Sequence, residues 1–166
     1  MYYINTFLFY SILGHFFENF IYSKIDSGIL YGYWTPIYGM GALLILFIFY
    51  LISKKMKNKF IRPIILFFSS GLILGLFELI SGFIIERIFG RIFWDYSDEA
   101  FSIFRYTSLK MMMVWGISSI ILIYIIHPFL KFVIKKIPKV ISIPLAFLFI
   151  FDLVYAIIQL ETKMLY

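Results

Sequence analysis

Long apolar stretches alternate with short polar connections along the whole chain. Five of them approach the roughly 20 residues that a helix needs to cross a bilayer; they lie at 2–23, 35–52, 63–85, 107–127 and 140–160. Strands of a membrane barrel alternate apolar and polar residues, and these stretches do not. The pattern therefore predicts an all-α bundle of about five transmembrane helices in a single domain that covers residues 1–166.

The composition supports a membrane location. Apolar residues make up 63% of the chain, whereas soluble proteins contain about 45–50%, and too little polar surface remains to cover a soluble core. Cysteine is absent, which excludes disulfides and thiolate metal ligands. The bias toward Ile, Phe, Lys and Asn is typical of an AT-rich bacterial genome, so we expect a multi-pass protein of the bacterial cytoplasmic (inner) membrane.

Two connections are strongly basic, and they set the expected orientation. They hold no acidic residue, and their basic residues are Lys54, Lys55, Lys57, Lys59 and Arg62 in one, and Lys131, Lys135, Lys136 and Lys139 in the other. Basic loops stay in the cytoplasm, so the N-terminus is expected inside and the C-terminus outside. This placement explains the net charge of +6 without nucleic acid. The basic loops, 53–62 and 131–139, can also bind anionic lipid or a cytoplasmic partner.

The chain shows a weak self-similarity. A shift of 60 places Glu18 on Glu78, Asp26 on Glu86 and Trp34 on Trp94. Units 1–52 and 61–128 would then form a parallel repeat, as in some transporters, with 140–160 as an additional fifth span. The alternative is a chance alignment, because aromatic-rich apolar sequences align easily with themselves.

Ionisable residues inside the spans are the candidates for a functional site. Each costs at least about 2.5–3.5 kcal/mol at the bilayer centre. We expect Glu18, Glu78 and Asp152, with His15 and the loop residue Asp95, to line one polar cavity open to the outer side. Alternatively, each carboxylate joins two helices through hydrogen bonds. His15 is interpreted as a partner of Glu18 rather than as a metal ligand, because one His with scattered carboxylates is a weak metal signal.

The third span has one face of small residues. Gly71, Gly75, Glu78 and Gly82 are spaced four, three and four residues apart, so they share one side of a helix. Small residues let a neighbouring backbone approach closely. The spacing predicts that Glu78 lies in a groove against another helix.

The outer loop after this span is rich in aromatic and acidic residues. Asp98 and Glu99 after Ser97 are typical of a helix start, which predicts a short interfacial helix over 98–106 with Phe101 and Phe104 on the lipid. Trp94 and Tyr96 are expected as interface anchors. Asp95 is expected to accept a hydrogen bond or to meet Arg87 or Arg91.

The second span begins with a Pro- and Gly-rich segment, 34–41. Thr35 and Pro36 suit a helix start, and the glycines weaken helix propagation. Such an interrupted span indicates a binding site in transporters; the alternative is an ordinary helix start with close packing at the glycines.

Two segments together resemble a known family. The first holds Pro36, Tyr38, Gly39 and Gly41, and the second holds Trp94, Asp95, Tyr96 and Ser97. With the acidic residues of the first and third spans, they resemble the type IV ABC-transporter (CmpB-like) permease family over about residues 10–120. Ser102 stands where the family usually has Asn. The resemblance implies a multi-pass bacterial membrane protein with a role in transport.

Three functions fit the sequence. The chain has no nucleotide-binding motif, so a transport subunit would need a separate cytoplasmic ATPase, docked on the basic loops. A non-catalytic membrane partner or assembly protein is the second reading. The third is a lipid-acting membrane enzyme with Glu18, Glu78, Asp95 and His15 as acid and base groups, although no catalytic motif is present. No cofactor or metal ion is expected.

The orientation can be tested with single cysteines, because the chain has none of its own. In whole cells, Ser97→Cys should react with a membrane-impermeant thiol reagent, and Asn58→Cys should react only after the membrane is opened. The reverse pattern would exclude a cytoplasmic N-terminus.

Overall fold

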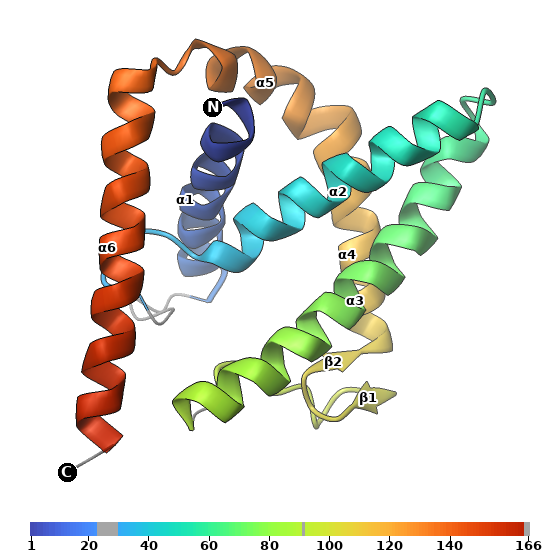
Figure 1. Ribbon diagram of the computed structural model, residues 1–166. Coiled ribbons are helices and arrows are strands. Elements are labelled where there is room, and N and C mark those ends of the chain that lie inside the picture. The colour runs from blue at the N-terminus through green and yellow to red at the C-terminus, as the bar shows by residue number, and fades with distance from the viewer. Residues whose placement is uncertain (23–29, 91, 165–166) are drawn as a thin grey trace. The chain divides into compact units, whose positions relative to one another are not determined.

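The computed structural model describes residues 1–22, 30–90 and 92–164. The described chain is almost wholly helical, with one two-stranded hairpin (Figure 1). The residues Asp26 and Arg91, on which predictions depend, lie outside the described part. The elements are α1 (Tyr2–Tyr22), α2 (Pro36–Lys55), α3 (Ile61–Phe89), β1 (Ser102–Ile103), β2 (Thr107–Ser108), α4 (Leu109–Ile121), the π-helical turn η1 (Leu122–Ile126), α5 (His127–Lys136) and α6 (Lys139–Met164).

Four helices are long and apolar enough to cross a membrane, at Pro36–Lys55, Ile61–Ile88, Leu109–Lys136 and Lys139–Gln159. They match four of the predicted stretches. The helix α1 forms where the first stretch predicts one, but polar residues such as Asn5, His15 and Glu18 lower its mean hydropathy. A fifth span therefore stays a prediction, and so does the orientation of the chain.

The chain divides into two compact units. The first unit joins Met1–Leu43 with Phe129–Tyr166, and the second unit is Leu44–Pro128. The core of the second unit lies between the later part of α2, the first half of α3 and η1. Its buried residues are Ile45, Ile48, Ile52, Leu66, Leu74 and Ile123.

The small-residue face of α3 packs as its spacing predicts. Helices α3 and α4 lie side by side (Figure 1). A Cβ at Gly71 would lie 2.6 Å from the carbonyl oxygen of Met112 on α4, and one at Gly82 would lie 2.4 Å from the ring of Tyr106. At Gly71 the two backbones approach too closely for a side chain, and at Gly82 the Tyr106 ring occupies the space. Glu78 is thus held on the face that α3 turns toward α4 and the hairpin.

The fourth span is longer than the sequence indicates. It was expected to end at His127, yet the helix continues through Pro128 to Lys136. A proline normally clashes with the carbonyl of the preceding turn. Here the turn before it is π-helical, and the His127 N–H bonds to the Leu122 oxygen, five residues back. The wider turn gives the proline ring room.

The predicted basic loop 131–139 is therefore wrong as a loop. Its first part is the end of α5, and only residues 137 and 138 connect α5 to α6. In the first unit, the Asn5 side chain of α1 donates hydrogen bonds to the oxygens of Ile134 (3.4 Å) and Ile137 (3.3 Å). These bonds satisfy carbonyls at the C-terminal end of α5.

Each unit contains a close helix crossing at a glycine. In the first unit, a Cβ at Gly39 of α2 would lie 2.5 Å from the oxygen of Phe7 on α1. In the second unit, a Cβ at Gly116 of α4 would lie 2.9 Å from the oxygen of Phe67 on α3. Phe7 and Phe67 are separated by the 60-residue shift of the sequence comparison. The internal repeat stays a prediction, and this correspondence supports it.

Candidate functional site

The carboxylate of Glu78 is the most enclosed acidic group of the second unit. The residue is 3% exposed. The Tyr96 hydroxyl donates a hydrogen bond to Oε1 at 3.0 Å, and the Thr107 hydroxyl donates one to Oε2 at 3.1 Å. Trp115 of α4 is a further polar neighbour of this carboxylate. Both carboxylate oxygens thus have neutral donors, and no ion pair to Glu78 forms within the described residues.

Thr107 lies in a strained hairpin, and Tyr96 lies in the loop that precedes it. Strands β1 and β2 pair antiparallel, with Ser102 opposite Ser108 and Ile103 opposite Thr107. Phe101, Phe104 and Arg105 have φ angles of 57°, 51° and 65°. For residues other than glycine such conformations cost of order 1–3 kcal/mol each and persist only where the surroundings hold them. The predicted helix over 98–106 is therefore wrong.

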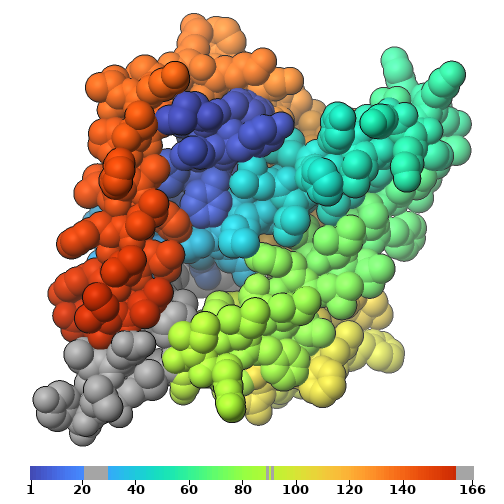
Figure 2. Space-filling model, in the orientation of Figure 1, coloured from blue at the N-terminus to red at the C-terminus, as the bar shows by residue number. Residues whose placement is uncertain are grey.

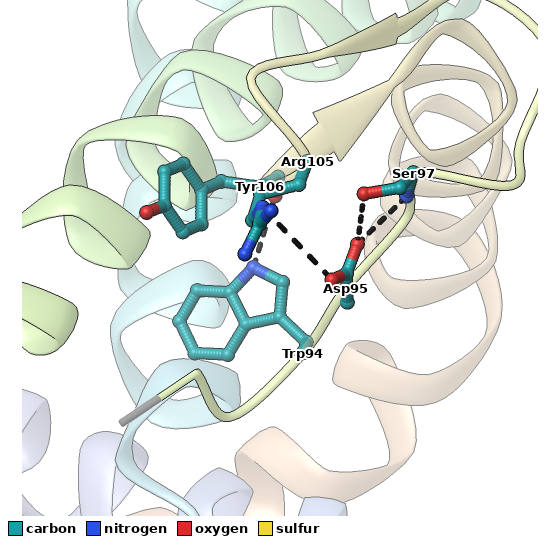
Figure 3. A network of polar contacts seen from close by, with 5 residues as sticks. All are labelled: Trp94, Asp95, Ser97, Arg105 and Tyr106. Carbon is teal, nitrogen blue, oxygen red and sulfur yellow. Dashed lines mark hydrogen bonds and ion pairs between the residues drawn. The ribbon is translucent and has the colours of Figure 1, made fainter. Parts of the chain in front are cut away.

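Two hydrogen bonds to the loop before the hairpin hold this backbone. The Trp94 indole donates to the Tyr106 oxygen at 2.9 Å, and the Tyr96 N–H donates to the Arg105 oxygen at 2.8 Å. Figure 3 shows the indole turned toward the hairpin backbone. Trp94 and Tyr96 were expected to anchor the chain in the interface, but the polar groups of both side chains bond inside the protein.

Asp95 serves the same loop locally. Its Oδ1 accepts hydrogen bonds from the Ser97 N–H at 2.8 Å and from the Ser97 hydroxyl, and its Oδ2 lies 3.9 Å from Nε of Arg105 (Figure 3). The Ser97 hydroxyl is the main cause that lowers the pKa of Asp95, followed by the Ser97 N–H; Arg105 adds a smaller contribution. Asp95 thus accepts hydrogen bonds from a neighbour, which is one of the two expected alternatives, and its ion pair is with Arg105. Arg91 lies outside the described residues.

In the first unit, Asp152 of α6 binds the segment that precedes α2. The residue is 9% exposed. Its oxygens accept hydrogen bonds from the N–H groups of Tyr31 (3.1 Å) and Gly32 (2.8 Å) and from the Trp34 indole (2.7 Å). These three donors suit a carboxylate that fixes a loop. Asp152 thus joins α6 to the segment before α2 rather than to a second helix.

His15 and Glu18 meet through Thr35. The side-chain nitrogen of Asn19, which can only donate, lies 2.9 Å from His15 Nε2, and the Thr35 hydroxyl lies 3.4 Å from Nδ1. A neutral ring then carries its proton on Nδ1 and donates to Thr35. Thr35 is also a polar neighbour of Glu18. The expected His15–Glu18 pair is thus indirect, and the result is a polar chain from Asn19 to Glu18.

One oxygen of this chain remains unsatisfied. Glu18 Oε2 is buried without a hydrogen-bond partner among the described residues. Such a group is costly in an apolar setting, so it is a natural point for a proton or a polar ligand. No group of three His, Asp or Glu within the described ranges is arranged to hold a metal ion.

The five candidate residues thus fall into two groups, one in each unit. Segment 31–35 brings Asp152, His15 and Glu18 onto one loop of the first unit. In the second unit Glu78 is enclosed, while Asp95 organises the loop that encloses it. Convergence of all five on one cavity stays a prediction.

The second-span signature serves helix packing. Pro36 begins α2, Gly39 contacts α1, Gly41 is buried, and the Tyr38 ring fills the space where Gly14 lacks a side chain. This supports the simpler alternative, an ordinary helix start with close packing. The sequence did not reveal Thr107, because a hydroxyl at the start of an apolar stretch is common and no local pattern pairs it with a glutamate 29 residues earlier.

Comparison with known proteins identifies one family. The family described as "Putative ABC-transporter type IV" matches residues 5–158. No curated protein matches the chain, and no solved structure matches it.

The role of Asp152 can be tested by Asp152→Asn. An amide keeps only one acceptor oxygen for three donors, so the free energy of unfolding should fall by about 2–3 kcal/mol. Thermal unfolding in detergent measures the change. Asp98→Asn makes the same chemical change at an exposed loop position and serves as the control. Equal stability of both variants would contradict the tethering role.

The role of Ser97 can be tested by Ser97→Ala, which removes the main cause of the lowered Asp95 pKa. The Asp95 pKa should rise toward its usual value, as read from a carboxyl ¹³C NMR titration of Asp-labelled protein. Because this pKa is depressed in the folded protein, the charged Asp95 stabilises the loop above its unfolded-state pKa. That stabilisation is lost as the pH falls through the folded-state pKa. An unchanged pKa in the variant would show that Ser97 is not the cause.

Proposed function

The chain belongs to the family described as putative ABC-transporter type IV, and from that premise we propose that it is the membrane-embedded subunit of a transport system with a polar site at Glu78. It is a multi-pass membrane protein with four helices suited to cross a bilayer. The burial of Glu78 among neutral donors is the observation that carries the proposal.

A carboxylate in an apolar helix is costly wherever it lies deep in the bilayer, so such residues usually mark a pathway or a relay. Leucine at position 78 would pack on α4 without that cost. Glu78 has no basic partner among the described residues, which leaves its charge available for a proton or a cationic ligand. We assign it the role of the central binding group.

The hairpin is the cover of this site. It contributes the Thr107 hydroxyl on Glu78, the loop before it contributes the Tyr96 hydroxyl, and the hairpin backbone is held in strained conformations by bonds to residues 94–96. Release of those bonds would relieve the strain and uncover Glu78 in the same movement. The free energy needed to move the hairpin away from Glu78 is thus lower than the number of broken contacts indicates. A low opening cost suits a gated site.

The first unit offers a second polar centre, the chain from His15 through Thr35 to Glu18. Glu18 corresponds to Glu78 under the 60-residue shift, and each carboxylate has a hydroxyl neighbour from the connection after its own helix. Two related centres fit a transporter built from a parallel repeat. We place both on the outward-facing side, in line with the expected orientation.

The energy source would be a separate cytoplasmic ATPase. The connection between α2 and α3 suits its docking because Lys54, Lys55, Lys57 and Lys59 are all exposed. Local bonds shape this connection: Arg62 donates to the Met56 oxygen at 2.8 Å, and the Phe60 N–H donates to Asn58 Oδ1 at 2.9 Å. A rigid basic turn can bind an acidic surface specifically.

A non-catalytic membrane partner or assembly protein is the second candidate. The observation in its favour is that Glu78 and Asp152 have hydrogen bonds on both carboxylate oxygens. Carboxylates that only join elements would look the same. The two candidates differ in what neutralising Glu78 does.

The proposal predicts that a cytoplasmic ATPase co-purifies with the full chain from its native host in mild detergent, as mass spectrometry would show. The variant Lys54→Gln/Lys55→Gln/Lys57→Gln/Lys59→Gln should lose the ATPase. A matched variant with Gln at Lys131, Lys135, Lys136 and Lys139 should keep it. Absence of any ATPase from the wild-type preparation would contradict the proposal.

Glu78→Gln separates the two candidates in the same preparation. Gln keeps the hydrogen-bonding shape but not the charge, so the complex should stay intact while its ATP hydrolysis falls by about tenfold or more, the scale of one lost charged hydrogen bond. Unchanged hydrolysis with a lowered unfolding temperature would favour the assembly reading.

A further inference from the structure

Helix α5 has two apolar faces, and only one of them is covered. Ile134 is fully buried, and Asn5 of α1 bonds to the backbone oxygens at the end of the helix. On the other side Phe129 is 76% exposed, Phe132 64% and Val133 48%. At 100° per residue these three lie within about 100° of one another around the helix. The side chains of this orange segment are visible at the surface in Figure 2.

Exposed lysines surround this part of the helix. At 100° per residue Lys135 lies beside Phe132, and Lys131 lies farther round the helix. Lys136 lies on the apolar side itself, with its ammonium group 3.9 Å from the centre of the Phe132 ring. Lys139 follows at the start of α6. No acidic residue occurs between Lys110 and Asp152. A surface that is apolar, uniformly basic and free of acids is typical of a helix in the plane of a membrane interface.

The fourth span is long enough for its last part to lie at the membrane surface. The helix Leu109–Lys136 has 28 residues, whereas about 20 cross the hydrocarbon core. The surplus of eight residues equals the part of α5 that follows Pro128. Helix α6, another candidate span, begins after only two connecting residues, so the end of α5 must lie at the level where α6 enters the bilayer.

We propose that α5 is a membrane-surface helix that binds the headgroups of anionic phospholipids in the cytoplasmic leaflet. Phe129, Phe132 and Val133 insert among the acyl chains. The headgroup phosphates contact Lys131, Lys135, Lys136 and Lys139. Each lysine adds to the binding affinity about what one lysine near an anionic surface typically contributes. The assignment separates the two basic segments: the α2–α3 connection faces the cytoplasm, and α5 faces lipid. It does not depend on the transport proposal.

Native mass spectrometry of the purified, delipidated chain with added lipid tests the headgroup contacts. Wild-type protein should bind phosphatidylglycerol more tightly than phosphatidylcholine. The variant Lys131→Gln/Lys135→Gln/Lys136→Gln/Lys139→Gln should lose that preference, with roughly a tenfold or greater loss of phosphatidylglycerol affinity. The variant Lys54→Gln/Lys55→Gln/Lys57→Gln/Lys59→Gln has the same charge change and should keep it. Equal loss in both variants, or none in the first, would overturn the proposal.

Insertion of the apolar face has an independent readout. A polarity-sensitive fluorophore is attached to Phe132→Cys, the only cysteine of that chain, in nanodiscs of phosphatidylglycerol and phosphatidylcholine. It should emit at shorter wavelength than the same fluorophore attached to Lys57→Cys in the same nanodiscs. A water-exposed spectrum at position 132, or shielding of it only when an ATPase is bound, would assign this face to a protein partner instead. This fluorescence result does not depend on whether an ATPase co-purifies with the chain.

Discussion

A carboxylate in an apolar helix must find its hydrogen-bond donors within the protein, and the local structure of both units follows from this constraint. Asp152 binds two backbone N–H groups and an indole, which fixes the segment before α2. Glu78 binds two hydroxyls, which fixes the hairpin before α4. In each unit a loop that joins two helices is ordered by an acid on a helix. The acids thus act as organising centres whatever else they bind.

The helices were predictable because their signal is local and strong. Four spans and the glycine face of α3 follow from apolar length and a four-three-four spacing. The errors lie where a long-range contact outweighs a local preference. Residues 98–106 have the start signals of a helix, but bonds from Trp94 and Tyr96 hold them as a hairpin. Pro128 indicates a helix end, but a π-helical turn absorbs it.

The site was predictable in its acids and not in their partners. Charged residues in apolar runs stand out by their cost, so Glu18, Glu78 and Asp152 were identified from sequence. Thr35 and Thr107 were not linked to them, because a hydroxyl is compatible with many environments and its partner is set by the fold. Asp95 shows the converse: it belongs to the family signature, yet it organises a loop rather than a buried site.

The two-residue connection between α5 and α6 leaves the chain almost no slack. A helix on the bilayer surface moves along the membrane normal when the local bilayer thickness changes. Because the connection is so short, α6 would have to move with the end of α5. Asp152 on α6 would then pull on residues 31–34, and Asn5 would draw α1 along with the end of α5. The conformation of the first unit would then depend on the thickness of the bilayer around it.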